Sequence, residues 1–435
     1  MQDTSIFDLI TQEEIRQRDT LMLIPSENYT SKDVRTAVGS VLCNKYAEGY
    51  PTARYYQGNK WIDKVEIRAQ ELAKKLFGVP HANVQPYSGS PANSAIYFGL
   101  LNQGDTIMGL KLSAGGHLTH GHPDITFSGK FYTSVQYDVE ETGLIDMEKV
   151  RTQALQTKPH IITVGTTAYP RQFDWKAWRE IADEVGALLL ADISHIAGLI
   201  AGGAHESPVP YADVVMFTTH KTLRGPRGAV ILVTDRGLAR DPDMAKKIDR
   251  AVFPGLQGGP HNNTTAGIAI ALEHASSPDF KTYAHDIIKN ARTLSDTLMK
   301  AGLTLVTGGT DNHLMIIDLR DKHLVGNIVA EALEKAGIIV NRNSVPHDPQ
   351  PPFYPSGIRI GTPALTTRGM GTEEMHRIGK WIAEVIDLVS EYHLPEESTD
   401  RKEFMKEFRQ DINNHPRLAQ IATDVKSMCS AFPLE

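Results

Sequence analysis

Between residues 91 and 233 the chain alternates between helix-like and strand-like segments. Five short apolar runs have the composition of buried strands: 106–110, 160–164, 187–191, 214–217 and 229–233. Helix-like periodicity fills three further segments: 91–102, 146–156 and 175–185. Strands that alternate with helices form a mainly parallel sheet, because each helix crosses back over the sheet before the next strand. The sequence therefore predicts an α/β fold whose functional residues gather at the carboxyl ends of the strands.

The last third of the chain predicts a second, smaller α/β unit. Its strands are expected near 303–306, 313–318, 338–341 and 357–360, and its helices near 326–336 and 373–391. Other helices are expected at 6–20, 62–77, 265–275 and 281–301, with a charged helical tail at 402–430. We therefore expect an N-terminal helical arm over 1–40, a large domain over 41–275 and a small C-terminal domain over 276–435.

The segment from Asn28 to Asn59 has no clean period and is rich in glycine, tyrosine and polar residues. A long irregular stretch in a compact protein is usually a functional loop or an interface. We expect one of these roles here.

Charge and cysteine content exclude several function classes. The 435 residues hold 45 Lys+Arg and 52 Asp+Glu, a net charge of −7, so no basic excess favours nucleic acid or an anionic membrane. Two cysteines, Cys43 and Cys429, cannot form a disulfide framework, which is typical of a reducing compartment. The first residues lack a signal-peptide pattern, and no apolar run reaches membrane-spanning length. These features predict a cytoplasmic enzyme.

Two strand ends carry an acid and a lysine. Asp192 follows the apolar run Leu188–Ala191, and Lys221 follows the run that ends at Phe217, flanked by His220 and Thr218-Thr219. A lysine can form a Schiff base with an aldehyde, and an aspartate can keep a pyridine nitrogen protonated. Read singly, Asp192 is a turn aspartate and Lys221 a solvated charge. Together they predict a pyridoxal phosphate site, with His195 at the same edge.

A phosphate site is expected at Ser88-Gly89-Ser90, which precedes the helix 91–102. Hydroxyl groups and backbone N–H groups at a helix N-terminus bind anions, and the helix dipole favours negative charge. An ordinary helix cap, with serine at the N-cap and proline at the first helical position, is the alternative. A second glycine-rich turn, Gly258-Gly259, either completes the cradle or is a plain turn.

Three histidines cluster at His117, His120 and His122. Clustered histidines suggest a metal, but no carboxylate or cysteine accompanies them at a characteristic spacing. A histidine ring stacked on a flat cofactor needs no such companion. We therefore predict no metal site.

Two further charged residues stand out. Arg359 lies inside an apolar strand, where an unpaired cation is costly, so either a substrate carboxylate or a structural acid pairs with it. Glu48 lies in Tyr46-Ala47-Glu48-Gly49-Tyr50, and aromatic neighbours can tune a glutamate for proton transfer. A surface glutamate is the plain alternative.

As a set, these motifs resemble the serine hydroxymethyltransferase family of fold-type-I pyridoxal-phosphate enzymes. The resemblance runs from about Leu23 to Thr366. It rests on Ser26-Glu27-Asn28-Tyr29, Asn44-Lys45-Tyr46-Ala47-Glu48-Gly49-Tyr50-Pro51, Arg54-Tyr55-Tyr56, Gly115-Gly116-His117-Leu118-Thr119-His120-Gly121, Thr219-His220-Lys221-Thr222-Leu223, Gln257-Gly258-Gly259-Pro260, Asn343-Ser344-Val345-Pro346 and Gly357-Ile358-Arg359. It implies an aspartate-aminotransferase-like fold, with a large domain and a smaller C-terminal domain.

The resemblance also implies a role for each residue. Lys221, Glu48, His220, Asp192 and Tyr56 would form the catalytic set. The cofactor would contact Lys221, Asp192, His195, His117, Ser88, Gly89, Ser90, Thr167, Thr218, Tyr46, Gly258 and Gly259. The amino-acid substrate would contact Ser26, Tyr56, Glu48, Arg359 and His195. Tetrahydrofolate would contact Leu112, Gly116, Leu118 and Asn343.

The implied reaction moves the hydroxymethyl carbon of L-serine to tetrahydrofolate, giving glycine and 5,10-methylenetetrahydrofolate. The resemblance further implies a homodimer, or a tetramer built from dimers, in which Tyr46, Glu48, Tyr56, Gly258 and Gly259 serve the active site of the second subunit. One departure lies beside Tyr56, where Gln57-Gly58-Asn59-Lys60 replaces the two glycines and later glutamate common in the family.

Two alternatives remain open. A relative that acts on α-methylserine, or on a β-hydroxy amino acid without folate, would keep the same cofactor residues. The residues implied for folate, notably Leu118 and Asn343, argue against it. A catalytically idle relative with a binding role is disfavoured because Lys221, Asp192 and Glu48 are all present.

Overall fold

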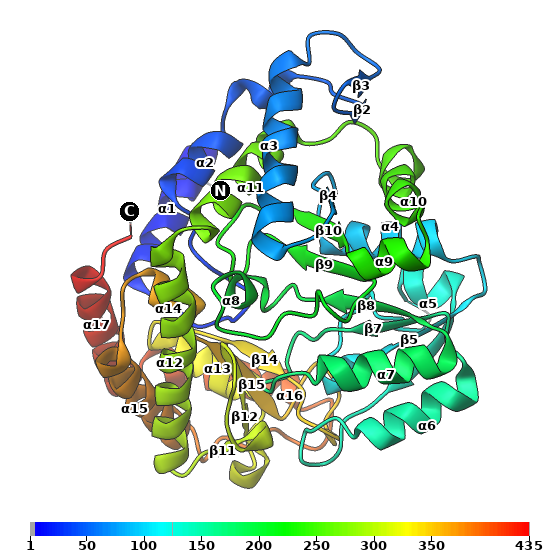
Figure 1. The fold of residues 1–435 in the computed structure, drawn as a ribbon. Helices are drawn as coiled ribbons and strands as arrows, with labels where there is room; N and C mark the ends of the chain where they lie inside the picture. Colours follow the sequence, from blue (N-terminus) through cyan, green and yellow to red (C-terminus); the bar gives the residue numbers. More distant parts are fainter. Residues whose placement is uncertain (1–4, 124, 435) are drawn as a thin grey trace. The chain divides into compact units, whose positions relative to one another are not determined.

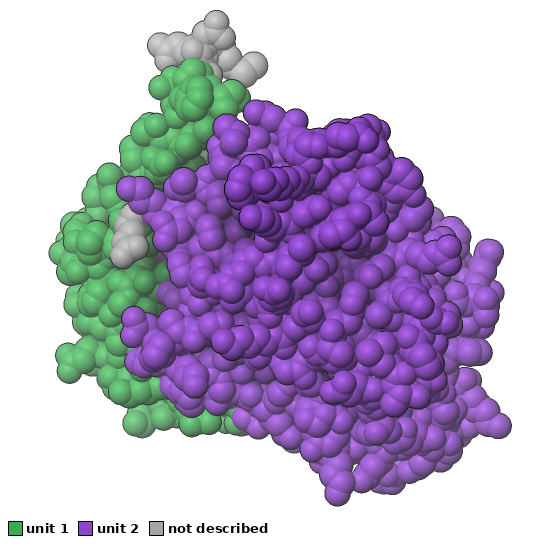
Figure 2. Space-filling model, turned by 45° about the horizontal axis from the view of Figure 1, so that its top comes forward, with its two compact units in different colours: residues 1–27, 286–435 green, residues 28–285 purple. Residues whose placement is uncertain are grey.

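The computed structural model describes residues 5–123 and 125–434. The chain divides into two compact units, which are coloured separately in Figure 2. Unit 1 comprises residues 1–27 and 286–435, and unit 2 comprises residues 28–285. The sequence predicts domain boundaries after residues 40 and 275, and this division into an arm, a large domain and a small domain stays a prediction.

Unit 2 is built on a sheet with the strand order β4-β10-β9-β8-β7-β5-β6, seven strands within the described residues (Figure 1). The strands are β4 (His81–Asn83), β5 (Thr106–Leu110), β6 (Thr133–Tyr137), β7 (Ile161–Val164), β8 (Leu188–Asp192), β9 (Val214–Thr218) and β10 (Ala229–Val233). Neighbours from β9 to β6 are parallel, and only β10 pairs antiparallel with β9 and β4. The mainly parallel sheet predicted from the alternating pattern is confirmed.

The central strands are buried along almost their whole length, which explains why they read as apolar runs without alternation. Every residue of β9 and β10 is buried. Ile107, Ile161, Leu190 and Met216 pack with α4 in one core cluster. Burial of this apolar surface is the main force that holds the sheet and its helices together.

Helices flank this sheet (Figure 1). They are α2 (Lys32–Val38), α3 (Lys60–Phe77), α4 (Gly89–Leu100), α5 (Phe127–Phe131), α6 (Met147–Thr157), α7 (Trp175–Val185), α8 (Ala197–Ala201), α9 (Asp235–Arg240), α10 (Met244–Arg250) and α11 (Asn262–Ala275). Single turns are η1 (Val41–Asn44), η2 (Leu112–Ala114) and η3 (Ala251–Leu256), and α12 (Pro278–Lys300) runs on into unit 1. Gly78 and Gly186 end α3 and α7 with φ of 67° and 72°, a conformation that glycine adopts without steric cost.

The segment from Asn28 to Asn59 is more regular than its composition predicts. It contains α2, η1 and a small hairpin of β2 (Gly49–Tyr50) and β3 (Ala53–Arg54). The elements are too short for a periodic pattern to appear in the sequence, which is why the segment reads as an irregular loop.

Unit 1 contains a four-stranded sheet with the order β11-β12-β15-β14, counted over the described residues. Its strands are β11 (Thr304–Leu305), β12 (Leu314–Asp318), β14 (Asn341–Asn343) and β15 (Gly357–Gly361); β1 (Leu21–Met22) and β13 (Ile338–Ile339) form a separate parallel pair. The helices and turns are α1 (Ile6–Asp19), η4 (Val306–Gly308), η5 (Arg320–Lys322), α13 (Gly326–Lys335), α14 (Pro363–Thr367), α15 (Thr372–Leu388), α16 (Arg401–Asn413) and α17 (Pro416–Ala431). The predicted second α/β unit is therefore present. In the part of the chain that the structure describes, no helix is both long and apolar enough to cross a membrane.

Candidate active site

The ends of β8 and β9 bring the two predicted key residues together. The strands are parallel neighbours, and Asp192, the last residue of β8, is in register with Met216 of β9. Lys221 follows β9 after a short turn. One pocket in unit 2 is lined by Asp192, Lys221, His117, His195 and Thr218, among others. Parallel pairing thus converts two distant sequence motifs into one site.

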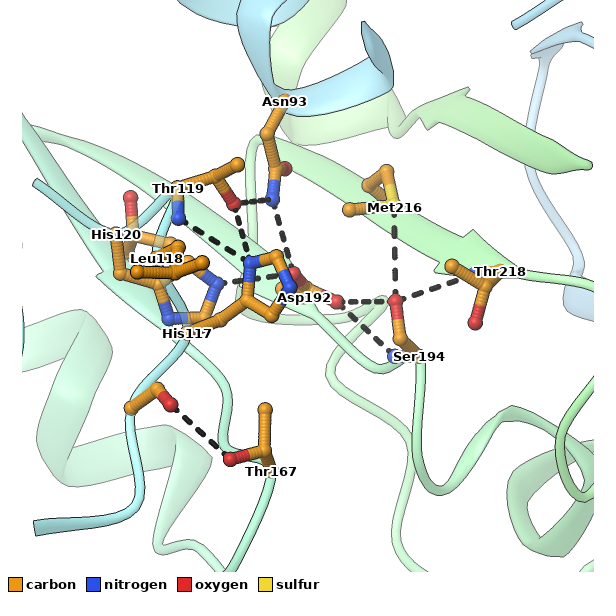
Figure 3. Close-up of polar contacts among 12 residues, drawn as sticks. Asn93, His117, Leu118, Thr119, His120, Thr167, Asp192, Ser194, Met216 and Thr218 are labelled. Atoms are coloured by element: carbon orange, nitrogen blue, oxygen red, sulfur yellow. Dashed lines mark hydrogen bonds and ion pairs between the residues drawn. The ribbon is translucent and has the colours of Figure 1, made fainter. Parts of the chain in front are cut away.

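Asp192 is held in a dense network of hydrogen bonds (Figure 3). The Asn93 amide donates to Oδ2 at 3.0 Å, and His120 Nε2 lies 2.9 Å from the same oxygen. The Ser194 hydroxyl and backbone N–H donate to Oδ1 at 2.5 and 3.1 Å. All four side chains are buried. The carboxylate is therefore fixed in position in surroundings that exclude water.

This network determines the charge of Asp192. Burial alone would raise the pKa of its carboxyl, but the hydrogen bond and charge of His120, together with the Ser194 hydroxyl, outweigh burial. The pKa of Asp192 is held well below its ordinary value. The residue is thus a permanent buried anion that faces the pocket.

His117 lies beside this network with a neutral ring. Burial, and then the charge of His120, lower its pKa from 6.5 to about 4. Its Nδ1 lies 2.8 Å from the Thr119 hydroxyl and accepts the Thr119 backbone N–H at 3.2 Å. Thr119 in turn accepts from Asn93 at 2.8 Å. These contacts fix the plane of an uncharged imidazole at the pocket wall, as stacking on a flat ring requires.

Residues around Lys221 include buried polar atoms that the protein itself does not satisfy. Thr218 Oγ1 and His220 Nδ1 are both buried without a hydrogen-bond partner among the described residues. Burial, followed by the charges of Lys221 and Arg227, lowers the pKa of His220 to about 3, so its ring is neutral. Buried polar groups left unpaired are costly unless a ligand pairs with them.

The expected phosphate cradle starts α4. Ser88 is the N-cap residue, but its side chain makes no capping hydrogen bond, and Pro91 is the third helical residue rather than the first. A Cβ on Gly89 would lie 2.6 Å from Thr218 Cγ2, so a side chain at position 89 would clash with the end of β9. Ser90 is exposed at the helix start. The geometry differs from the ordinary cap that was the alternative reading.

The loop around His117 holds three residues expected at the folate site. The Thr167 hydroxyl donates to the Gly116 carbonyl at 3.1 Å, which ties this loop to the segment after β7. Leu112 and Leu118 are 39% and 42% exposed, although they are large apolar residues. Two exposed leucines on one loop offer an apolar surface to a ligand.

A second group of predicted site residues lies on another part of unit 2. The rings of Tyr46 and Tyr56 meet edge to face with centroids 5.2 Å apart, and the two residues are 58% and 46% exposed. A Cβ on Gly258 would lie 3.4 Å from a carboxylate oxygen of Glu48, and one on Gly259 would lie 3.4 Å from the Tyr46 ring. None of these five residues lines the pocket of Asp192 and Lys221.

The hairpin that carries Glu48 is anchored by a buried ion network. The Arg54 guanidinium donates to the carbonyls of Ala47 and Gly49, at 2.9 and 2.7 Å, and to the carboxylates of Asp63 and Glu66, at 2.9 and 2.6 Å. The side chains of Arg54 and Glu66 are 3% and 2% exposed. Residues on both sides of Glu48 are thus held by a single arginine.

Arg359, Ser26 and Asn343 belong to unit 1. Arg359 lies in β15 and is buried; its Nε donates to Asn341 Oδ1 at 3.0 Å and its guanidinium to the Ser26 hydroxyl at 3.4 Å. Burial lowers the pKa of Arg359 to about 10, so the side chain stays cationic at neutral pH. Asn343, in β14, donates from its amide to the Ser344 carbonyl at 2.7 Å.

Several contacts escaped sequence reasoning. Asn93, Thr119, His120 and Ser194 surround the site although no role was predicted for them. Asn93 lies one helical turn after Gly89, a spacing that places both on one face of α4. His120 was weighed only as a metal ligand. Among the described residues, no three His, Cys, Asp or Glu side chains are grouped as a metal site requires.

Taken together, the pocket suits a pyridine ring that carries an aldehyde and a phosphate. It offers a lysine amine, a buried carboxylate anion, a neutral imidazole wall, and the buried Thr218 hydroxyl, which has no hydrogen-bond partner among the described residues. These groups match the cofactor atoms that need protein partners.

Comparison with known proteins gives consistent results along the chain. The family model described as serine hydroxymethyltransferase matches residues 1–382. A serine hydroxymethyltransferase of Acidothermus cellulolyticus is 56% identical over 389 residues, 89% of each chain. One from Desulfotalea psychrophila is 50% identical over 432 residues, 99% of this chain and 94% of that protein. One from Sorangium cellulosum is 52% identical over 432 residues, 99% and 95% of the two chains.

Proposed function

This chain belongs to the serine hydroxymethyltransferase family of enzymes, and we propose that it transfers the hydroxymethyl carbon of L-serine reversibly to tetrahydrofolate. The products are glycine and 5,10-methylenetetrahydrofolate. The observation that carries this proposal is the buried, hydrogen-bonded carboxylate of Asp192 in the same pocket as Lys221.

Pyridoxal phosphate, when bound, supplies an electron sink for the electron pair released at the substrate Cα. Lys221 would hold it covalently through its amine. Asp192 would hold the ring nitrogen, because an anion with such a low pKa keeps a neighbouring pyridine nitrogen protonated. His117 would pack on the ring face. His195 and Thr167 would contact the phenolic oxygen.

The phosphate would be held where α4 begins, by Ser88, Gly89 and Ser90. The Ser88 hydroxyl, which makes no capping hydrogen bond, and the positive end of the helix dipole support this role. Thr218 supports it as well, since its buried hydroxyl lacks a partner among the described residues. Tyr46, Gly258 and Gly259 would complete the cofactor site.

Substrate recognition would use Arg359 for the α-carboxylate, because a planar cation binds a carboxylate in bidentate fashion. The Asn341 amide and the Ser26 hydroxyl orient that guanidinium. Tyr56, Ser26 and His195 would contact the rest of the amino acid.

Glu48 would move the proton at the serine hydroxyl or the folate nitrogen, and His220 would act beside Lys221 as a neutral imidazole. Leu112, Gly116, Leu118 and Asn343 would line the folate site; the exposure of the two leucines supports this. A homodimer in which Glu48, Tyr46, Tyr56, Gly258 and Gly259 serve the second subunit fits their separation from the pocket lining.

The test is an assay of glycine and 5,10-methylenetetrahydrofolate formed from serine and tetrahydrofolate, with Lys221→Ala as the matched variant. We expect turnover by the wild-type protein, and loss of both turnover and covalently attached cofactor in Lys221→Ala. Glycine release from a β-hydroxy amino acid without any folate-dependent turnover of serine would replace this proposal with the aldolase alternative. A variant that keeps covalent cofactor would remove Lys221 from its role.

A further inference from the structure

A pocket of about 770 Å³ lies in unit 1. Of the residues given a role above, its lining includes Asn341, the hydrogen-bond partner of Arg359. Its walls come from α13, from β13 and β14, from the segment with Phe353 and Tyr354, and from α16. Cavities of 300–1,000 Å³ are typical of small-molecule sites, in which apolar walls are combined with a few polar groups.

Part of the pocket lining is apolar and aromatic. Val340 and the buried Met405 line it, and the Phe353 and Tyr354 rings meet edge to face with centroids 4.9 Å apart. Phe353 is 66% exposed, which is unusual for a ring of this size. An exposed ring in the same lining as apolar side chains favours a flat aromatic ligand that packs against it.

The cations that line the pocket outnumber the carboxylates that neutralise them. Arg409 is matched by Glu331, through hydrogen bonds of 2.7 and 2.8 Å. Within the described residues, no carboxylate forms an ion pair with Arg342 or Lys402. Glu334 is the second acid in the lining. Three cations and two acids line the pocket, so the lining has a net charge of +1.

Arg342 is held in place by uncharged partners. Its guanidinium lies over the Phe353 ring at 5.4 Å and donates to the Phe353 carbonyl at 3.3 Å. The Asn327 side chain is oriented so that its amide oxygen accepts a hydrogen bond from the Arg342 guanidinium. Its amide nitrogen donates to the Phe353 carbonyl at 3.1 Å. A cation positioned by neutral partners keeps its electrostatic capacity for an anionic ligand.

We propose that this pocket is a second ligand site, for a planar aromatic compound that carries one carboxylate or similar anionic group. The ring packs on Val340 and Met405 beside Phe353, and the anionic group meets Arg342 and Lys402. This site shares no lining residue with the pocket of Asp192 and Lys221, and its assignment does not depend on the reaction proposed there.

Calorimetric titration of the cofactor-loaded protein with indole-3-acetate tests the proposal. Saturating glycine is included so that the amino-acid carboxylate site is filled. We expect saturable binding of indole-3-acetate, binding weaker by several-fold for the uncharged indole-3-acetamide, and weaker still for acetate. Absence of indole-3-acetate binding at millimolar concentration, or equal binding of the amide, overturns the proposal.

Charge variants locate the binding. Lys402→Gln and Arg342→Gln are expected to weaken indole-3-acetate binding about two- to fivefold, the range of a solvent-accessible ion pair. Glu334→Gln is expected to tighten it, because removal of the acid ends a repulsion. Lys406→Gln is the control, since Lys406 lies on the same helix but outside the lining. Identical affinities in all four variants would assign the binding elsewhere.

Discussion

The surroundings of Asp192 and those of Glu48 differ in almost every physical respect. Asp192 is buried and receives hydrogen bonds from Asn93 and Ser194, all supplied by unit 2 itself. Glu48 is partly exposed, and the neighbouring rings of Tyr46 and Tyr56 are about half exposed.

This difference shows how preorganisation is distributed in the site. All the groups that hydrogen-bond to Asp192 come from the same chain and are already in position, so their electrostatic effect requires no further reorganisation. The backbone around Glu48 is fixed by Arg54, but its side chains have room for a partner surface. Exposed aromatic clusters of this kind often become buried at interfaces.

Removal of the Asp192 charge should have the largest effect. In Asp192→Asn we expect turnover to fall by at least about 10³-fold, because a neutral amide cannot keep the ring nitrogen protonated. Steady-state kinetics and the visible spectrum of the bound cofactor measure this. Asp138→Asn is the matched control, since Asp138 follows β6 but pairs on the surface with Lys111. A loss confined to KM would contradict the proposed role of Asp192.

Glu48→Gln should retain cofactor and glycine affinity but lose about 10²- to 10⁴-fold in folate-dependent turnover, the usual contribution of a general acid or base. Single-turnover kinetics with serine and tetrahydrofolate measure this. Glu71→Gln, exposed on α3, is the control. Unchanged turnover would exclude Glu48 from proton transfer.

Hybrid dimers of two inactive variants test whether Lys221 and Glu48 serve one active site from different subunits. If Glu48 serves the second subunit, Lys221→Ala and Glu48→Gln chains reassociated together should regain up to about one quarter of wild-type activity, the statistical limit for random pairing in dimers. No recovery in reassociated hybrids would place both residues in the site of one chain.

Arg54 holds the backbone on both sides of Glu48, and its loss should lower the stability of the protein as well as its activity. Arg54→Leu leaves Glu66 buried without its cation, so we expect the free energy of unfolding to fall by about 3–5 kcal/mol. Urea denaturation measures this. Arg68→Leu is the matched control, because the Arg68–Glu273 pair is 55% and 59% exposed and such pairs contribute about 0–1 kcal/mol. Equal losses would show that burial does not distinguish the two pairs.

The smallest expected effect is the pH dependence that His117 contributes to the cofactor-free protein. Its folded pKa is about 4, below the ordinary 6.5, so the unfolded chain binds the proton first as the pH falls. The neutral, buried His117 therefore contributes fully to the free energy of unfolding above pH 6.5. This contribution is lost as the pH falls from 6.5 to 4. We expect the urea midpoint of His117→Gln to fall less steeply than that of the wild type over this range. Parallel curves would contradict a neutral buried His117.

Residues next to strands were the most predictable part of the site. Asp192 and Lys221 follow apolar runs, and parallel strands end at one edge, so their proximity could be inferred before any coordinates. Roles for Tyr46 and the folate residues came only from the family resemblance, whereas Glu48 was already a proton-transfer candidate because of its aromatic neighbours. His120 and Ser194 were missed, because a hydrogen bond to Asp192 leaves no periodic or spacing signal in the sequence.

By itself, the sequence determined the alternating α/β order, the two α/β units and the family, because hydrophobic period and motif order are local properties of the chain. Only the tertiary structure decided which polar groups surround Asp192 and Arg359, which hydroxyls remain without partners, and where a second pocket lies. Burial and hydrogen-bond geometry depend on residues that are distant along the chain, and those residues meet only once the core is packed.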